Sequence, residues 1–504
     1  MSTPSVNSIV ILGGGTAGWM AASSLAKYFT SLKIPMDIQL VESTDIGTVG
    51  VGEATLPGIR DFNASLGIDE VDFIRKTQAT FKLGIEFKDW NHLGESFFHP
   101  FANFGFDINN VSFHHYIRKL NELGDNLNLE DYSLPTALSK LGNFAQPHAQ
   151  PSTPLGEYHY AFHFDATLYA KYLRNFALNH GVKRYDNKVT SVNTRVEDGF
   201  IKSLTLDSGA TIEGDLFIDC SGFRGLLIEE TLHTGYEDWS HWLNCNSAIA
   251  LQSEHEGAPP PFTSTQALAA GWQWKIPLQN RMGNGYVYCD KYISDDEAIN
   301  TLTKNIKNNL VADPKIIKFT AGHRLKCWNK NCVALGLAVG FLEPLESTSI
   351  SMIQTGIARL LKFFPHKGFD SHDTEEVNRL CKTEFERIRD FLILHYSNSA
   401  RLDTPFWRDC NNRSIPNTLA HKISIFKSRG HLIHHEGESF QDASWLTMYN
   451  GFKIDASQWD ARANYIEINE LRHNLEQMKK SIQHAAKQAI THEEFIARHC
   501  RSQE

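Results

Sequence analysis

Long hydrophobic runs and paired cysteine motifs are both missing from this 504-residue sequence. A helix that crosses a membrane needs about 20 mostly apolar residues in a row, and no run approaches that length. The first residues, MSTPSVNS, also lack the basic and apolar regions of a secretion signal. The eight cysteines show no CxxC spacing, which argues against a zinc site and a disulfide framework. We therefore expect a cytoplasmic protein with reduced thiols, no metal ion and no membrane association.

Basic residues are scarce as well. The sequence holds 49 Lys and Arg residues against 58 Asp and Glu residues, a net charge of −9. Nucleic-acid binding needs clustered Lys and Arg residues, and none are clustered here, so nucleic acid is not an expected partner. Internal repeats and low-complexity linkers are absent too. Aromatic side chains, in contrast, make up 11% of the chain, which suits a flat apolar ligand or a large core.

A dinucleotide-binding pattern begins with the apolar run at residues 9–12, which predicts a buried parallel strand. A GxGxxG turn at residues 13–18 and an alanine-rich helical pattern follow it. In such a turn the first glycine permits a tight bend, the second admits a pyrophosphate, and the third lets helix and strand pack closely. The helix N-terminus then faces the phosphates with unpaired N–H groups. The predicted cofactor contacts here are Gly13, Gly15, Thr16, Ala17 and Gly18.

A second strand, DIQLVES at residues 37–43, contains Glu42, the acid expected to accept a ribose hydroxyl. The next segment, residues 45–62, is too rich in glycine for a regular helix. Its position predicts a backbone that passes close to the ligand, with Glu53 in contact with the cofactor; a purely structural loop is the alternative. The glycines of this segment are Gly47, Gly50, Gly52 and Gly58.

Beyond the nucleotide pattern, residues 68–78 predict an amphipathic helix. The apolar residues at positions 81, 83, 85 and 87 then alternate as in a strand whose opposite face carries Lys82. A lysine on the polar face of a strand is ordinarily solvated, so Lys82 by itself predicts nothing.

The remaining segments are harder to interpret. Residues 103–154 are rich in loop signals, and residues 215–223 resemble the last strand of a nucleotide-binding unit. Residues 332–337 predict a further strand, and the final third is mostly helical in pattern, including a charged helix around residues 466–487.

Four stretches together resemble the flavin-dependent tryptophan halogenase family. They are GGGTAGWMAA, the FKLGI segment with Lys82, the WQWKIP run from Trp272 to Pro277, and GFLEPLESTSI from Gly340 to Ile350. The resemblance implies an α/β fold like that of class A flavin monooxygenases. An FAD module with a Rossmann-type βαβ unit and an antiparallel sheet, residues 1–100 and 155–360, would carry a mostly helical substrate module, residues 101–154 and 361–504.

The resemblance also implies a reaction and the residues that perform it. Halide ions and arenes are both nucleophiles, so chloride or bromide must first be oxidised to hypohalous acid, which FADH2 and oxygen achieve in a dry cavity. Trp272 and Trp274 would keep the organic substrate away from the flavin. Lys82 would receive the hypohalous acid, and Glu346 would polarise it or remove the ring proton. The other implied cofactor contacts are Val189, Leu337, Gly340 and Ile350.

The GFLEPLESTSI stretch implies a halide site beside the flavin, at backbone N–H groups of Thr348 and Ser349. Ser347 would link this site to the substrate. Members of the family commonly have glycine after the threonine, and the serine found here leaves the choice between chloride and bromide open.

The expected substrate is an indole-like or other electron-rich arene. His99, Pro100 and Phe101 match the indole-stacking loop of the family, but residues 426–452 lack the tyrosine and Phe-Trp pairs that hold free tryptophan. Histidines in the same segment do not have the spacing of a metal site. No second nucleotide motif is present, so a separate flavin reductase is expected to supply FADH2 to a monomer or homodimer. An aromatic monooxygenase and a non-catalytic FAD-binding protein are the alternatives.

Overall fold

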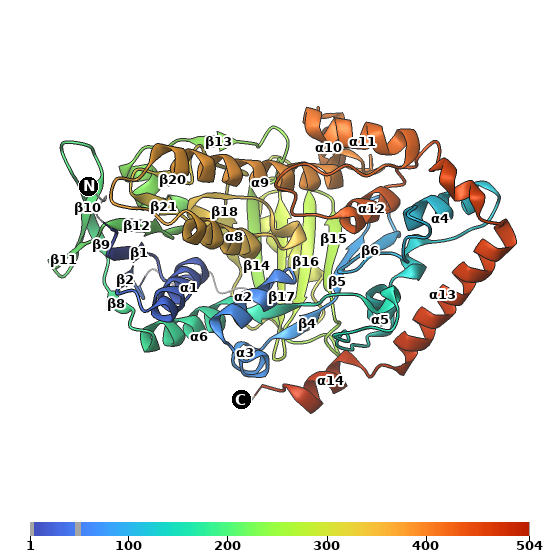
Figure 1. Cartoon of the computed structure of the whole chain (residues 1–504), viewed down its shortest axis with the longest axis horizontal. Coiled ribbons are helices and arrows are strands. Elements are labelled where there is room, and N and C mark those ends of the chain that lie inside the picture. The colour runs from blue at the N-terminus through green and yellow to red at the C-terminus, as the bar shows by residue number, and fades with distance from the viewer. Residues whose placement is uncertain (1–4, 46–51, 503–504) are drawn as a thin grey trace.

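The computed structural model describes residues 5–45 and 52–502. Figure 1 shows an elongated molecule in which a parallel sheet with α1 and α6 lies at one end, a long antiparallel sheet fills the middle, and α4 and α13 lie at the other end. The long helix α9 (Ser371–Ser397) runs over the middle of the molecule. Within the described residues, no helix is long and apolar enough to cross a membrane.

The parallel sheet is built around β1 (Ser8–Leu12), whose buried apolar residues lie between the neighbouring strands β12 and β2. Helices α1 (Thr16–Leu32) and α6 (Ala166–Asn179) pack beside it. The predicted strand at residues 37–43 is confirmed as β2. The strand predicted at residues 332–337 is shorter, because Gly336 takes a positive φ and begins a 3-10 turn. The sheet order is β20 (Trp328–Asn329), β21 (Cys332–Ala334), β12 (Leu216–Asp219), β1, β2 (Asp37–Glu42) and β8 (Lys183–Asp186).

The central sheet has seven strands, and its middle strand β16 (Gly271–Pro277) carries the WQWKIP sequence. Every residue of its neighbour β17 is buried, so this part of the sheet is covered on both faces. All pairs in the sheet are antiparallel except β15 with β5. The order is β18 (Lys315–Lys318), β14 (Ser247–Ser253), β17 (Met282–Tyr288), β16, β15 (Thr263–Leu268), β5 (Gly84–Lys88) and β6 (Ser96–Pro100).

Three small sheets connect these layers. The first places β4, with Lys82 at its end, beside β7 and β3. The strand predicted across residues 81–87 is therefore wrong as a single element: β4 ends at Lys82, Leu83 donates its N–H to Pro261, and β5 joins a different sheet. The three sheets are β3 (Gly52–Ala54), β7 (Ala161–Asp165) and β4 (Thr80–Lys82); β11 (Thr211–Glu213), β10 (Ile201–Leu206) and β9 (Val189–Thr194); and β13 (Tyr236–Asp238), β19 (Gly322–Arg324) and β22 (Gly340–Phe341).

Helices dominate the last third, as predicted, and the charged helix expected at residues 466–487 is α13. The loop-rich interpretation of residues 103–154 holds for most of the segment but missed its two helices. That segment holds α4 and α5, whose short amphipathic patterns are stabilised by packing against α13, as in the cluster of Tyr116, Leu120, Leu471 and Leu475. The remaining helices are α2 (Gly58–Leu66), α3 (Glu70–Thr77), α4 (Phe113–Glu122), α5 (Leu134–Leu141), α7 (Asp295–Lys304), α8 (Ser349–Lys362), α10 (Pro405–Asn412), α11 (Asn417–Arg429), α12 (Asp442–Gly451), α13 (Ile468–Gln488) and α14 (His492–His499).

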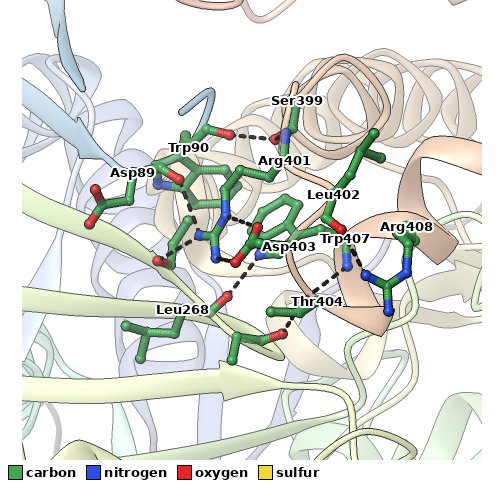
Figure 2. A network of polar contacts seen from close by, with 12 residues as sticks. Asp89, Trp90, Leu268, Ser399, Arg401, Leu402, Asp403, Thr404, Trp407 and Arg408 are labelled. Carbon is green, nitrogen blue, oxygen red and sulfur yellow. Dashed lines mark hydrogen bonds and ion pairs between the residues drawn. The ribbon is translucent and has the colours of Figure 1, made fainter. Parts of the chain in front are cut away.

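A polar network ties the connection between α9 and α10 to the central sheet (Figure 2). The buried guanidinium of Arg401 donates to the carbonyl oxygens of Asp89 at 3.2 Å and Ala267 at 3.0 Å, and to the carboxylate of Asp403. The indole N–H of Trp407 donates to the carbonyl of Leu268 at 2.8 Å. The network thereby secures the turn that leads into β16.

Candidate active site

A cavity of about 960 Å³ extends from the glycine turn after β1 to the central sheet. Its wall contains most of the residues predicted to contact a cofactor. The thiols of Cys220 and Cys381 belong to the same wall. Predicted residues that line the cavity are Gly13, Gly15, Thr16, Ala17, Glu42, Glu53, Val189, Trp272, Trp274, Leu337, Gly340, Ser347, Ser349 and Ile350.

The glycine turn has the geometry that a pyrophosphate needs. Gly13 has a φ of +112°, and a Cβ there would lie 2.2 Å from the carbonyl oxygen of Cys220. Gly15 is the N-cap of α1 and offers no side chain, so the first N–H groups of the helix are free to bind an anion. Gly18 does not line the cavity; a Cβ at Gly18 would meet the oxygen of Gly13 at 1.9 Å, so its role is close packing of helix on strand.

Two carboxyl groups lie beside the glycine turn. Glu42 ends β2 and accepts from Arg184 Nε at 2.5 Å and from Trp19 Nε1 at 3.4 Å. Glu53, in β3, lines the cavity, and burial raises its pKa to about 7. No group in the described part of the chain donates to the Glu53 carboxyl, which is therefore available to a ligand. The predicted approach of the backbone to the ligand at Gly47 and Gly50 falls outside the described residues.

Two tryptophans of β16 form the cavity wall on the side of the central sheet. The ring centroids of Trp272 and Trp274 are 5.9 Å apart, as expected for alternate residues on one strand face. Gly285 on β17 makes room for Trp274, because a Cβ there would lie 1.9 Å from the indole ring. Trp272 donates its indole N–H to Glu343 Oε2 at 2.9 Å. Sequence reasoning missed Glu343.

Lys82 is completely buried, unlike most lysines on the polar face of a strand. Its Nζ donates to the hydroxyl of Ser347 at 2.8 Å and to the carbonyl of Thr55 at 3.0 Å, and it lies 5.2 Å from the centre of the Phe101 ring. Burial lowers the pKa of Lys82 to about 7, against an opposing effect of Glu346. A substantial fraction of this lysine is therefore a neutral amine near pH 7.

Glu346 lies in the 3-10 turn after Glu343 and is also completely buried. Its carboxylate accepts from His99 Nδ1 and from His395 Nε2, both at 3.0 Å. Burial would raise the pKa of Glu346, but the two histidines outweigh it and hold the pKa at about 2. The group is an ionised carboxylate in a dry environment.

His395 was not found by sequence reasoning, because one histidine near the end of a long amphipathic helix gives no signal. Its Nδ1 lies 2.8 Å from the carbonyl of Phe391, and its Nε2 faces the ionised carboxylate of Glu346. The ring thus bridges the backbone of α9 and the carboxylate. His395 holds the Glu346 carboxylate in place from the side of α9.

Ser347 joins the two parts of the site. It has a φ of +60° and lines the cavity. Its hydroxyl accepts a hydrogen bond from Lys82 Nζ. Thr348 follows as the N-cap of α8, and its buried hydroxyl has no partner among the residues described. Ser349 begins α8 and lines the cavity. An anion at this helix N-terminus would meet open N–H groups and one free hydroxyl.

Of the residues predicted to contact substrate, Ser347 lines the cavity, whereas His99, Pro100 and Phe101 lie near Lys82 and Glu346, outside the cavity wall. His99 and Pro100 are in β6 and are buried, so the loop expected here is a strand. His99 Nε2 lies 2.9 Å from the hydroxyl of Ser444 on α12. The ring of Phe391 on α9 stacks on that of Phe440, with ring centroids 3.9 Å apart. Across the described residues, no group of three or more His, Cys, Asp or Glu side chains is placed to hold a metal ion.

Comparisons with known proteins agree with this geometry. The family model described as tryptophan halogenase matches residues 8–467. The tryptophan 6-halogenase ThaL of Streptomyces albogriseolus is 36% identical over 455 residues, 84% of this chain and 82% of that protein. The structure of BrvH, a flavin-dependent halogenase from Brevundimonas sp. BAL3, is 44% identical with a TM-score of 0.95, over 98% of this chain and 99% of that one. For Xcc4156, a flavin-dependent halogenase from Xanthomonas campestris, the values are 43% and 0.95, over 99% of each chain.

These likenesses confirm the predicted α/β fold class and the resemblance on which it was based. The family-model match covers more than half of the chain, and the glycine turn, Trp272, Trp274, Lys82 and Glu346 all lie within the matched residues. The chain therefore belongs to the flavin-dependent tryptophan halogenase family, whose general function is FADH2-dependent halogenation.

Proposed function

We propose that this enzyme halogenates an indole-like or other electron-rich arene, with FADH2, oxygen and chloride or bromide, through hypohalous acid that reaches Lys82. The single observation that carries the proposal is the position of Ser347. Ser347 lines the cavity, and its hydroxyl lies 2.8 Å from Lys82 Nζ, so a small oxidant made in the cavity would have a short way to travel to the lysine.

The cavity suits FAD. Gly13, Gly15, Thr16 and Ala17 would hold the pyrophosphate and Glu42 the ribose, while Glu53 would contact the flavin part. Val189, Leu337, Gly340 and Ile350 would complete the wall around the cofactor. When bound and reduced, FAD supplies the oxidising equivalents from oxygen that convert halide to hypohalous acid.

Trp272 and Trp274, the tryptophan wall of the cavity, would determine which molecules the oxidant can react with. Trp272 and Trp274 line the side of the cavity that faces the central sheet and would keep an arene away from the flavin. The halide would bind at the start of α8, where the N–H groups of Thr348 and Ser349 and the unpartnered hydroxyl of Thr348 can surround an anion. Ser349 places a side chain at this turn, which supports a preference between chloride and bromide that is particular to this enzyme.

Lys82 would present the halogen to the arene. As an amine with a pKa of about 7, it can form a haloamine in its neutral form or donate a hydrogen bond to hypohalous acid in its charged form. Glu346 is already ionised and would take the proton that the ring releases after attack, or polarise the halogen source. His395 holds the carboxylate in place from one side and His99 from the other.

The proposed substrate is a free or substituted indole without an amino-acid group. The curated relative ThaL is named a tryptophan 6-halogenase, but residues 426–452 of this chain lack the residues expected to hold free tryptophan. Here Ser444 of that segment instead hydrogen-bonds His99. A separate flavin reductase would supply FADH2 to a monomer or homodimer in the cytoplasm.

The decisive test supplies purified enzyme with FAD, a flavin reductase, NADH, oxygen, bromide and a panel of indoles, and analyses products by mass spectrometry. We expect brominated indole from the wild type. We expect none from Lys82→Ala, although Lys82→Ala should bind FAD as tightly as the wild type. Oxygenated product without bromine at saturating bromide would show an aromatic monooxygenase instead. Brominated product from Lys82→Ala would contradict the role of the lysine.

A further inference from the structure

The indole of Trp272 is held by the carboxyl group of Glu343, which has no part in the proposed reaction. Trp272 Nε1 donates to Glu343 Oε2 at 2.9 Å, and the hydroxyl of Tyr396 donates to the same oxygen at 2.5 Å. All three side chains are buried. The other oxygen, Glu343 Oε1, is buried and has no partner among the described residues. The arrangement is a buried acceptor aimed at two donors.

The other contacts described for the Trp272 ring are with aromatic rings, Trp90 and Trp274. Trp90 lies 6.3 Å away between ring centroids, and Trp90 in turn contacts Tyr396 and Trp407 edge to face. Such ring contacts are worth about 1 kcal/mol each and allow several ring orientations. A hydrogen bond to a buried acceptor is directional, so Glu343 determines which edge of the indole faces the cavity.

Glu343 also stands next to the catalytic turn in the chain. The 3-10 turn Pro344–Glu346 follows it directly and leads to Ser347. The backbone of Glu343 is thus part of the segment that carries Glu346, and its side chain holds the tryptophan wall. One residue connects the cavity wall with the turn on which the Lys82 site is built.

We propose that Glu343 is a positioning residue that fixes the indole of Trp272 in the cavity wall, so that the oxidant formed in the cavity reacts with halide and not with an organic molecule. The inference rests on the proposed function for its consequence, but the contact itself does not. Burial raises the pKa of Glu343 to about 7, and in either protonation state Oε2 can accept from Trp272.

Two substitutions separate an acceptor from a residue that only fills space. Glu343→Gln keeps an oxygen at the Oε2 position, and its amide nitrogen can take the place of Oε1, which has no partner to lose. Glu343→Met has a similar length but no acceptor. A space-filling role predicts that both variants behave alike, whereas a positioning role predicts that only Glu343→Gln retains wild-type behaviour.

The first measurement needs neither cofactor nor activity. The indole N–H signals of ¹⁵N-labelled protein are recorded, and the Trp272 signal is assigned by its loss in Trp272→Phe. We expect the signal to be unchanged in position and hydrogen-exchange rate in Glu343→Gln, and shifted upfield with faster exchange in Glu343→Met. Tyr396→Phe is the matched control, since it removes the other donor and leaves the Trp272 contact intact. An unchanged Trp272 signal in Glu343→Met would overturn the proposal.

If Glu343→Met fails to fold, Glu343→Asp takes its place, because it withdraws the carboxyl by one methylene and keeps its charge. The same shift and faster exchange are expected. An unchanged Trp272 signal in Glu343→Asp would equally overturn the proposal.

The second measurement is the amount of halogenated indole formed per FADH2 consumed, with hydrogen peroxide and oxygenated indole measured alongside. We expect Glu343→Met to lower this yield roughly tenfold, because it removes one buried hydrogen bond to a charged or polar acceptor. We expect Glu343→Gln to keep the wild-type yield. Equal yields in the two variants would overturn the consequence. If the wild type forms no halogenated product while the indole signal responds as expected, the proposed function fails and the contact stands.

Discussion

At the scale of single residues, burial is the cause of the unusual chemistry of this site. Lys82 and Glu346 have no exposed surface, yet their pKa values move in ways that serve different roles. The lysine has too little solvation to hold its proton firmly, while two histidines compensate the carboxylate for the solvation it lacks. The sequence could not show this, because it revealed neither the depth of Lys82 nor the presence of His395.

Lys82 destabilises the folded protein in a way that depends on pH. Its pKa is about 7 in the fold and near 10.4 in an unfolded chain, so between these values the unfolded chain binds a proton that the folded chain has released. The free energy of unfolding therefore rises with pH across this window. We expect Lys82→Met to be more stable than the wild type by on the order of 2 kcal/mol near pH 7, with a gain that shrinks toward pH 10.

Chemical denaturation of both proteins at pH 7, 8.5 and 10 measures this effect. A stability gain that is the same at all three pH values would show that the fold does not lower the pKa of Lys82.

Glu346→Gln should lower halogenation by about 100-fold or more, the usual contribution of a general base, because an amide cannot take the ring proton. FAD affinity, followed by flavin fluorescence, should not change. Glu86→Gln on β5 is the matched control, since Glu86 bonds Ser264 and Lys88 away from the site. Equal losses in the two variants would remove Glu346 from the mechanism.

At the scale of elements, the local sequence pattern predicted the strands and turns that depend mainly on their own residues. The run at residues 9–12, the glycine turn, and Trp272 and Trp274 on one strand face are where they were expected. Within the loop-rich residues 103–154, α4 and α5 were missed because they are short and gain their stability from α13, far along the chain. The break between β4 and β5 was missed because alternation continues through Leu83 although the two strands belong to different sheets.

The glycine turn gives the element-scale prediction. Gly13→Ala places a Cβ 2.2 Å from the oxygen of Cys220 at a φ of +112°, so the turn must open and its N–H groups lose their orientation. We expect FAD affinity to fall at least about tenfold, as for the loss of one or two charge-assisted hydrogen bonds. Fluorescence titration measures it.

Gly181→Ala is the control for this prediction. Gly181 also has a positive φ, +88°, but a Cβ there meets nothing within 4 Å, so backbone strain is present without the contact. If the two variants bind FAD equally, the close approach at Gly13 has no role in the affinity.

At the scale of the whole molecule, Arg401 joins the helical part to the central sheet. Arg401→Ala leaves the carbonyl oxygens of Asp89 and Ala267 without their donor, at a cost of about 1 to 3 kcal/mol for each buried group. We expect a melting temperature lower by several degrees, measured by calorimetry. Arg408→Ala is the control, because Arg408 makes one exposed bond, to Leu402. A smaller loss for Arg401→Ala than for Arg408→Ala would contradict this role.

The division into two modules at residues 1–100 and 155–360, and 101–154 and 361–504, stays a prediction. Arg401 shows why the sequence gives little help with it: Arg401 lies far along the chain from Asp89 and Ala267, and nothing in the local pattern indicates that they meet.

Burial of the cavity wall also has a consequence for chemoselectivity. Hypohalous acid attacks nucleophilic sulfur even more readily than nitrogen, and Cys220, Cys327 and Cys381 lie in the wall. Burial raises the pKa of the Cys220 thiol, and the neighbouring Cys327 thiol together with burial raises that of Cys381, so both stay protonated and weakly nucleophilic. The same exclusion of water that makes Lys82 a better nucleophile makes the Cys220 and Cys381 thiols worse ones, which under the proposed function would favour transfer of the halogen to nitrogen.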